Sequence, residues 1–260
     1  LKHCDKIGPV EPTREYASKL LQYVISTGKQ NSTAEAYMKA FKRALDYSGL
    51  AHDIKVSELT AGLRRNDQKE EFLTKQDLKA IQEYQPESIS LQKAKDLFLF
   101  TCNTGMRHNE VVSITEDNVQ RREGYTTIKY VPSKAGSEVE VPLNDICLKI
   151  MERWNVVPVL SNTNANKYLH ELLGGIPRFQ ETSVQVRYSG SKKIQKTIKR
   201  CDAITFHTAR HSHMTRLLNH GMSVKEVSSL MGISSQTLVR YYSHSNKEER
   251  MAKALKILNK

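Results

Sequence analysis

The chain has 260 residues, of which 38% are hydrophobic and 26% are charged. This composition is ordinary for a soluble globular protein of one large or two medium domains, and no apolar run approaches the roughly 18 residues that a membrane span needs. The 40 Lys and Arg residues exceed the 28 Asp and Glu residues, and the formal net charge of +12 favours a polyanionic partner, nucleic acid before an anionic membrane surface.

The cysteines give no sign of a metal site or of a disulfide framework. Four of them are scattered along the chain without a C-x-x-C pair, namely Cys4, Cys102, Cys147 and Cys201. This argues against a zinc ribbon and is typical of free thiols in a reducing cytoplasm. Because the first residue is Leu1 rather than methionine, we expect the chain to be a piece of a longer protein.

Residues 1–66 predict a small helical domain. Tyr16, Leu20 and Val24 recur at helical spacing, and this helix should end near Gly28. The segment Ser32–Glu35 reads as a capping box that opens a second helix. A polar stretch, 64–71, then predicts a linker.

Residues 67–260 predict a larger, mostly helical domain with small antiparallel hairpins, which places the whole chain in the mainly α, α+β class. Capping residues are expected at Thr74, at Asn144 or Asp145, at Ser223 and at Ser245. A helix should end at Gly105. One hairpin is predicted from the strands 125–131 and 139–143, and a second from 184–188 and 194–198.

Three clusters of strong hydrogen-bond donors stand at the ends of predicted elements: 104–110, 207–211 and 240–244. Each has a common structural explanation, since an arginine after a glycine is often a solvated charge, a helix-start histidine often caps, and a Tyr-Tyr pair often packs in a core. The spacing of His207, His211 and His213 would suit zinc, but no acidic or cysteine partner is nearby. The sequence therefore predicts no metal site.

Together the clusters resemble the tyrosine recombinase (integrase) family, whose pattern is T-G-x-R-x-x-E, a hairpin lysine, H-x-x-R, a His or Trp, and a tyrosine. The matching catalytic positions are Arg107, Lys134, His207, Arg210 and Tyr242. The order and spacing agree over about residues 72–244, and residues 1–66 resemble the family's SAM-like core-site binding domain. The departure is Ile233, which stands where the family usually has His or Trp. Chemistry alone does not rank Tyr241 against Tyr242, but the spacing favours Tyr242.

The resemblance implies cleavage and rejoining of DNA through a 3′-phosphotyrosine. Two guanidiniums suit the charge that builds on a phosphate in the transition state. By the family's pattern, Tyr242 is the nucleophile, His207 its base and Lys134 the acid for the leaving 5′ oxygen. Glu110 is expected to support an arginine. No metal and no cofactor is expected.

The resemblance also implies the partners. We expect double-stranded core sites, a homo-tetramer on paired sites and accessory DNA-bending proteins, in the cytoplasm and away from membranes. Candidate DNA contacts are Lys39, Lys42 and Arg43 on the second helix and Lys192, Lys193, Lys196, Lys199 and Arg200 on the second hairpin, which could equally be a solvated basic hairpin. The apolar stripe Met251, Leu255 and Leu258 could dock on a neighbouring subunit or on its own domain.

The preferred function is integration and excision of a mobile element, such as a conjugative transposon or a phage, since 157–202 adds a long segment with an extra hairpin. A DNA invertase of the same family is the nearest alternative. A type IB topoisomerase uses similar chemistry without pairing of sites. A relative that only binds DNA is kept open by Ile233, because an isoleucine cannot hydrogen-bond a phosphate. If residues are missing upstream, an arm-site binding domain could be among them.

Overall fold

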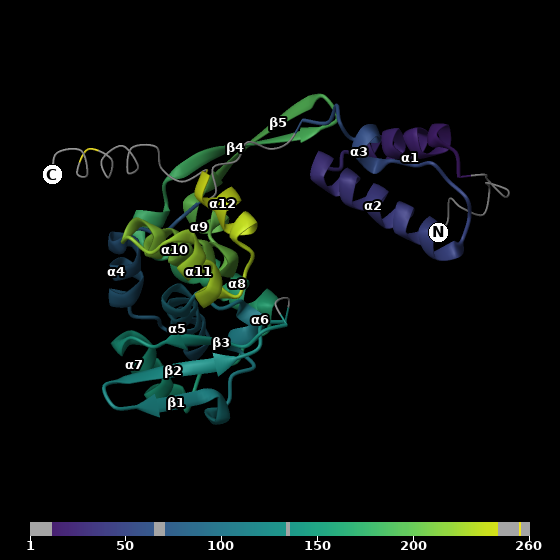
Figure 1. Ribbon diagram of the computed structural model, residues 1–260. Coiled ribbons are helices and arrows are strands. Elements are labelled where there is room, and N and C mark those ends of the chain that lie inside the picture. Colours follow the sequence, from purple (N-terminus) through teal and green to yellow (C-terminus); the bar gives the residue numbers. More distant parts are fainter. Residues whose placement is uncertain (1–11, 65–70, 134–135, 244–254, 256–260) are drawn as a thin grey trace. The chain divides into compact units, whose positions relative to one another are not determined.

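A computed structural model describes residues 12–64, 71–133, 136–243 and 255, with side chains through residue 239 and at residue 255. Helices dominate it, and its strands form one three-stranded and one two-stranded sheet, so the predicted α+β class is confirmed. The chain divides into two compact units (Figure 1). The first comprises Leu1–Gln68 with Val184–Thr197, and the second comprises Lys69–Ser183 with Ile198–Lys260. None of the described helices is both long and apolar enough to cross a membrane.

The first unit is built on three helices, α1 (Arg14–Ser26), α2 (Asn31–Ser48) and α3 (Val56–Leu59). Their apolar faces meet in a small core around Ala17, Leu21, Met38 and Ile54. The predicted capping box at Ser32–Glu35 is wrong, because α2 begins two residues earlier, after Gln30, and has no side-chain cap. Ser32 therefore lies inside the first turn of the helix.

A hairpin from far along the sequence completes this unit. It consists of β4 (Thr182–Ser189) and β5 (Lys192–Lys199), as predicted, and its outer part belongs to the first unit. The buried side chain of Asn31 holds its tip: Oδ1 accepts from the Gly190 amide at 2.6 Å, and Nδ2 donates to the carbonyl oxygens of Gly190 and Arg64, both at 2.9 Å. Asn31 thus bonds the hairpin tip instead of capping its own helix.

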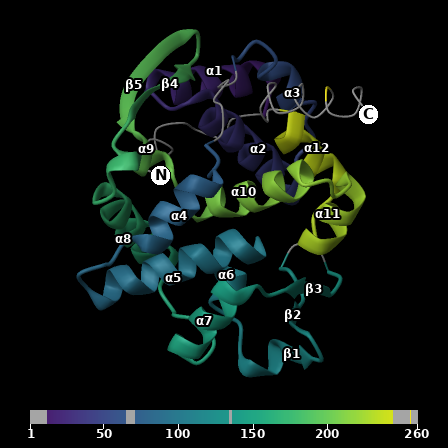
Figure 2. The ribbon, with the colours of Figure 1, turned by 90° about the vertical axis from the view of Figure 1, so that its left-hand side faces the viewer.

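The second unit is organised around α5 (Ile89–Thr104). The run Leu97–Phe100 is buried on all sides, since α5 packs against α4, α7, α8 and α10. Figures 1 and 2 show α5 and α10 lying side by side. The other helices of this unit are α4 (Lys75–Glu83), α6 (His108–Val111), α7 (Asp145–Trp154), α8 (Asn162–Gly174), α9 (Arg200–Ala203), α10 (Phe206–Asn219), α11 (Val224–Met231) and α12 (Ser235–Ser243), with 3-10 turns at Glu116–Asn118 and Pro177–Phe179.

The predicted caps at Thr74, Asn144 and Ser223 are confirmed, each side chain accepting a backbone N–H of the first turn. The C-terminal αL position at Gly105 is also confirmed as the end of α5. The predicted cap at Ser245 lies outside the described residues, as does the stripe beyond it except for Leu255, which is exposed.

The three-stranded antiparallel sheet has the order β1 (Val119–Arg122), β2 (Tyr125–Tyr130), β3 (Val139–Pro142). The β2–β3 hairpin was predicted, and β1 was not. The register of the β2–β3 hairpin pairs Ile128 with Val141 and Tyr130 with Val139. Ile128 and Val141 are buried, so the inner face of the sheet is part of the core, and the two strands that lead into the hairpin loop are held by this packing.

A buried carboxylate fixes the base of the hairpin β4–β5 within the second unit. Asp77 is fully buried and accepts from Thr74, Arg178 and Arg200. Burial alone would raise the pKa of Asp77, but these hydrogen bonds, led by that from Arg200, hold it well below its usual range. Arg200, which follows β5, is therefore engaged within the fold and is not a cation available for a partner.

Candidate active site

Arg107 is placed by the sharp turn that ends α5. Gly105 has φ +68°, and a Cβ there would lie 2.5 Å from Met231 Cε and 2.6 Å from His213 Cδ2, so only glycine fits. Two residues later, Arg107 precedes the short helix α6. The Arg107 N–H donates to Glu110 Oε2 at 2.8 Å, and its Nη1 donates to Glu110 Oε1 at 2.6 Å. Glu110 thus orients Arg107, as the sequence predicted for a support.

Arg210 reaches the same place from α10, and it is 4% exposed. Its Nη1 donates to the Gly105 carbonyl at 2.6 Å, and its Nη2 donates to the Met231 carbonyl at 3.0 Å. Glu110 Oε2 lies 4.0 Å from Nη1. Burial, followed by repulsion from Arg107, lowers the pKa of Arg210, but a guanidinium keeps its charge at neutral pH.

A tyrosine that sequence reasoning missed completes this cluster. The hydroxyl of Tyr130, at the end of β2, is near enough to Arg210, Arg107 and Glu110 for these groups to shift its pKa. Burial and the Glu110 carboxylate raise the pKa of Tyr130 to about 12, although Arg210 and Arg107 act in the opposite direction. In the sequence, Tyr130 is one more apolar residue of a strand, and no motif distinguishes it.

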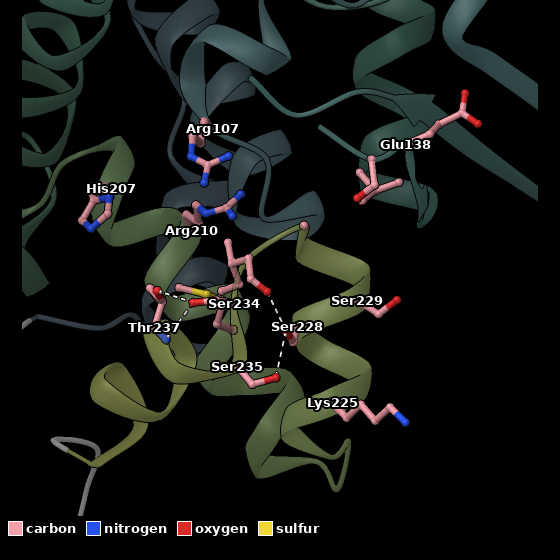
Figure 3. A pocket seen from close by; sticks show the side chains of 15 residues that line it. Arg107, Glu138, His207, Arg210, Lys225, Ser228, Ser229, Ser234, Ser235 and Thr237 are labelled. Atoms are coloured by element: carbon pink, nitrogen blue, oxygen red, sulfur yellow. Dashed lines mark hydrogen bonds between the residues drawn. The ribbon is translucent and has the colours of Figure 1, made fainter. Parts of the chain in front are cut away.

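Both arginines line an open pocket of about 860 Å³ (Figure 3). Figure 3 shows Arg107 and Arg210 next to one another, with His207 on the first turn of α10 and Lys225 on α11. Ser137, Glu138 and Val139 line it from the β2–β3 hairpin. Lys225 was not anticipated from the sequence. Cations outnumber the single carboxylate, so the pocket favours an anion with oxygen acceptors, such as a phosphate.

Ile233 lines the pocket at the turn between α11 and α12. Its side chain packs against an apolar cluster that includes Met214, Val227 and Leu238. Its carbonyl accepts from Ser228 Oγ at 2.5 Å, and Ser235 Oγ donates to Ser228 Oγ at 3.2 Å. The turn is held by hydroxyls, but the Ile233 side chain offers an anion no hydrogen bond.

The three histidines of α10 have different surroundings. His207 is exposed at the pocket, whereas His211 and His213 are buried. Burial, followed by the charge of Arg216, lowers the pKa of His213 to about 4, so its imidazole is neutral at pH 7. His213 Nδ1 lies 3.0 Å from the Cys102 carbonyl, which makes it a packing residue between α10 and α5.

Two expected catalytic residues are placed only in part. Lys134 lies outside the described residues, between β2 and the pocket-lining Ser137. Tyr242 lies in the last turn of α12, whose backbone is described through Ser243. The expected residues that line the pocket described above are Arg107, His207, Arg210 and Ile233.

The candidate DNA contacts have unequal charge surroundings. Lys39 is paired with Glu35 at 2.6 Å and Lys42 with Asp46 at 2.8 Å, both along α2, and Arg43 is exposed. On β5, Lys192, Lys193 and Lys196 are exposed, and no carboxylate within the described ranges pairs with them. Because side chains alternate along a strand, Lys192 and Lys196 share one face and Lys193 points to the other.

Comparison with known proteins identifies the family. The model of the phage integrase family matches residues 71–249. Tyrosine recombinase XerD of Pseudomonas aeruginosa is 28% identical over 154 residues, 56% of this chain and 47% of that protein. XerD of Staphylococcus aureus is 27% identical over 150 residues, 56% of this chain and 48% of that protein. The chain spans about half the length of the curated relatives it matches.

Solved structures share the fold. The Tn1549 transposon integrase in complex with transposon right end DNA has a TM-score of 0.64 at 16% identity, over 98% of this chain and 90% of that one. The XerH site-specific recombinase bound to palindromic difH substrate has a TM-score of 0.68 at 16% identity, over 99% and 76%. Because the family model covers more than half of the chain, the predicted resemblance is confirmed: the protein belongs to the phage integrase family.

Proposed function

We propose that the chain is a tyrosine-type site-specific recombinase that cuts and rejoins DNA through a 3′-phosphotyrosine. The observation that carries this proposal is the arginine pair, in which Arg107 and Arg210 share the buried Glu110 and line one pocket. Two cations against one carboxylate leave one positive charge for a phosphodiester. Donors aimed at charge that develops in a transition state are each worth roughly 10²–10³ in rate.

In the proposed cleavage step, the Tyr242 oxygen attacks the scissile phosphorus as the bond from phosphorus to the 5′ oxygen breaks. Only about one tyrosine in a thousand is ionised at pH 7, so the phenol must lose its proton to a base. His207, exposed at the pocket, is the proposed acceptor, and Lys134 is the proposed donor to the leaving 5′ oxygen. Arg107 and Arg210 hold the non-bridging oxygens throughout.

The products are a 3′-phosphotyrosine and a 5′-hydroxyl. A 5′-hydroxyl from a partner strand can attack the phosphotyrosine and release Tyr242, so the energy of one bond is kept for the next. The arginines supply the charge that a metal would otherwise supply, and the step consumes no nucleotide. We therefore propose that the reaction proceeds in a metal chelator.

The proposed partner is double-stranded DNA carrying core sites. Tn1549 integrase, XerH and lambda integrase were each solved bound to DNA, and the net charge of +12 supports the same partner here. Residues 1–66 would bind the core site and residues 67–260 would carry the chemistry. A homo-tetramer on paired sites, accessory DNA-bending proteins and a cytoplasmic location complete the proposal.

Integration and excision of a mobile element is the proposed role, supported by the long segment 157–202, which adds the hairpin β4–β5 as a separate two-stranded sheet. Inversion of a DNA segment would use the same chemistry on differently arranged sites. Ile233 specifically favours a second candidate, a relative that binds DNA without cutting it, because its side chain gives the pocket no hydrogen-bond donor.

Covalent trapping tests the proposal. The protein is mixed in EDTA with a pool of nicked duplexes that carry a randomised core, and adducts are isolated on a denaturing gel and sequenced. We expect a protein–DNA adduct, with a released strand that polynucleotide kinase labels directly because its 5′ end is a hydroxyl.

Tyr242→Phe should lose the adduct and Tyr241→Phe should keep it. Tight binding to the same pool without any wild-type adduct would contradict the proposal and support the binding-only candidate. An adduct lost only in Tyr241→Phe would leave the reaction class intact and move the nucleophile by one residue.

A further inference from the structure

Phe206 lies at the centre of a stack of three rings that joins three helices of the second unit. Its ring centroid is 5.4 Å from that of Phe98 on α5, with the ring planes at 90°, and 5.0 Å from that of His108 on α6, with the planes at 80°. Phe206 and His108 are both buried. Edge-to-face rings at such separations attract one another beyond the effect of their burial, so the stack holds the start of α10 against α5 and α6.

Each ring of the His108–Phe206 contact is the direct neighbour in sequence of a candidate catalytic residue. His108 follows Arg107, the residue that precedes α6, and Phe206 precedes His207 in the first turn of α10. Figure 3 shows Arg107 and His207 among the residues that line the pocket. One ring contact therefore connects the backbone that carries the arginine with the backbone that carries the proposed base.

Hydrogen bonds from α8 hold the same turn of α10. The Phe206 N–H donates to Asn166 Oδ1 at 3.2 Å, and His170 Nε2 lies 3.0 Å from the carbonyl oxygen of Ile204. The backbone just before His207 is thus held by polar contacts as well as by the ring stack. This backbone sets the point from which the exposed His207 side chain extends.

The histidine at position 108 contributes its ring rather than its polar atoms to this arrangement. Its Nδ1 lies 3.2 Å from Asn109 Oδ1, whereas its Nε2 is buried and has no hydrogen-bond partner among the described residues. A buried polar atom without a partner costs free energy. A phenylalanine at this position could pack its ring against Phe206 in the same way, without the unpartnered nitrogen.

We propose that Phe206 and His108 are positioning residues, whose ring contact holds His207 where it accepts the proton of the tyrosine nucleophile. This inference rests on the proposed function and adds two residues that the family pattern quoted above does not include. Neither ring touches the reacting atoms. Both act through His207, so the loss of the contact should matter only while His207 serves as the base.

The experiment measures single-turnover cleavage by the full chain on the trapped core sequence. Phe206→Leu keeps an apolar side chain and removes the ring. We expect its cleavage rate to fall by about 10- to 100-fold, because a displacement of about 1 Å at a catalytic group can cost that much. Its DNA dissociation constant should stay within about twofold of the wild-type value, since binding depends mainly on phosphate contacts.

Phe100→Leu is the matched control for the loss of a core ring. Phe100 is fully buried in the same core, two residues from Phe98 on α5. Its substitution should lower the stability of the fold and leave the cleavage rate within about threefold of the wild type. A wild-type rate in Phe206→Leu, or a loss in Phe100→Leu as large as that in Phe206→Leu, would overturn the inference.

Two substitutions of His108 test the ring contact from its other side. His108→Leu should lower the rate as Phe206→Leu does. His108→Phe should keep the rate within about threefold of the wild type, because it retains a ring at the contact. Equal losses in the two variants would mean that a histidine nitrogen is needed rather than the ring, and would contradict the inference.

A double-mutant cycle with His207→Ala separates positioning of the base from a general loss of structure. His207→Ala alone should cut slowly. Adding Phe206→Leu should slow it by no more than about twofold, because no base is left to be displaced. A loss that persists in full in the His207→Ala background would mean that the stack supports Arg107 or the fold as a whole, and the inference would fail.

Alkaline pH gives an independent readout. The ionised fraction of free tyrosine rises about 100-fold from pH 7 to pH 9, which reduces the need for a base. A substrate with a bridging 5′-sulfur, whose thiolate leaves without an acid, removes the dependence on Lys134 over this range. On this substrate the defect of Phe206→Leu should shrink to within about threefold at pH 9.

A defect of the same size at pH 7 and pH 9 would mean that the contact does not act through the base, and would overturn the inference. No cleavage by the wild type on any substrate would instead contradict the proposed function itself, so the two failures are distinguishable.

Discussion

Arg210 shows how single residues prepare the pocket. It is 4% exposed, and its nearest carboxylate, Glu110, is already bonded to Arg107. A buried charge needs partners, and here backbone carbonyls of Gly105 and Met231 supply them. Carbonyls stabilise the cation and leave its net charge in place. The arginine pair therefore keeps an unbalanced positive charge where an anionic substrate could enter.

Ile233 leads to a prediction at the same scale. Ile233→His should raise the rate of adduct formation by about tenfold or more, because a ring N–H would reach the pocket that Arg107 and Arg210 line. The isoleucine also packs in an apolar cluster, so the substitution should lower the free energy of unfolding by about 1–2 kcal/mol. Single-turnover trapping and denaturant unfolding measure the two effects.

Ile233→Leu is the control, since it keeps the packing and adds no donor. Its rate should equal that of the wild type. A histidine variant that folds and cuts no faster than the leucine variant would mean that the phosphate does not need a further hydrogen-bond donor beside the two arginines.

At the scale of elements, the contact of Asn31 with the hairpin tip predicts a local loss of stability. Asn31→Ala removes three hydrogen bonds at a buried position, and leaves the Gly190 amide and two carbonyls without these partners. We expect a loss of about 2–4 kcal/mol in unfolding free energy. The amide of Gly190 should exchange its hydrogen about 10- to 100-fold faster.

Ser191→Ala, one residue further along the same turn and exposed, provides the comparison and should change neither quantity. Since alanine is a better helix former than asparagine at the start of α2, any loss in Asn31→Ala cannot come from the helix. Unchanged exchange at Gly190 would show that the strands alone hold the tip.

The elements that the sequence predicted well are those with local signals. The predicted caps act through side chains within the same turn, at Thr74, Asn144 and Ser223. Gly105 ends α5 in the left-handed conformation, which a glycine in the sequence signals by itself. Such signals are complete within a few residues. The expected positions of Arg107 and Arg210 at one site came from the family pattern, and the pocket contains both.

The remaining elements depend on contacts that are distant in sequence. Asn31 lies 159 positions from Gly190 in the sequence, so its hydrogen bonds to the hairpin tip could not be predicted from local sequence, and neither could the start of α2 at this residue. The strand β1 has only four residues, two of them arginines, and only pairing with β2 makes it a strand. α8 begins with polar residues that hide its periodicity. Tyr130 was missed for the same reason, because the charged groups that shift its pKa lie on other elements.

On the scale of the whole molecule, the net charge is +12, and the lysines proposed to contact DNA differ in whether a carboxylate pairs with them. Those of α2 are bonded to carboxylates one turn away, and an intrahelical pair of this kind offsets much of the field of the cation. Those of β5 have no such partner among the described residues. The lysines of the hairpin are therefore more available to a polyanion than those of α2. The resemblance to a core-site binding domain had favoured the α2 positions.

This difference predicts an unequal salt dependence of DNA binding. Lys192→Gln with Lys196→Gln removes two exposed cations from one face of β5, so the slope of log K against log salt should fall in magnitude by about 2. Lys39→Gln with Lys42→Gln should change it by less than about 1, because both lysines are already paired with carboxylates and therefore make weaker phosphate contacts. Fluorescence anisotropy titrations of a labelled 30-base-pair duplex between low and moderate salt give the slopes. The control for loss of a surface lysine is Lys19→Gln, because Lys19 pairs with Glu15 on α1. Equal slopes in all three variants would mean that the hairpin lysines are solvated charges, and that the phosphate contacts come from other parts of the chain.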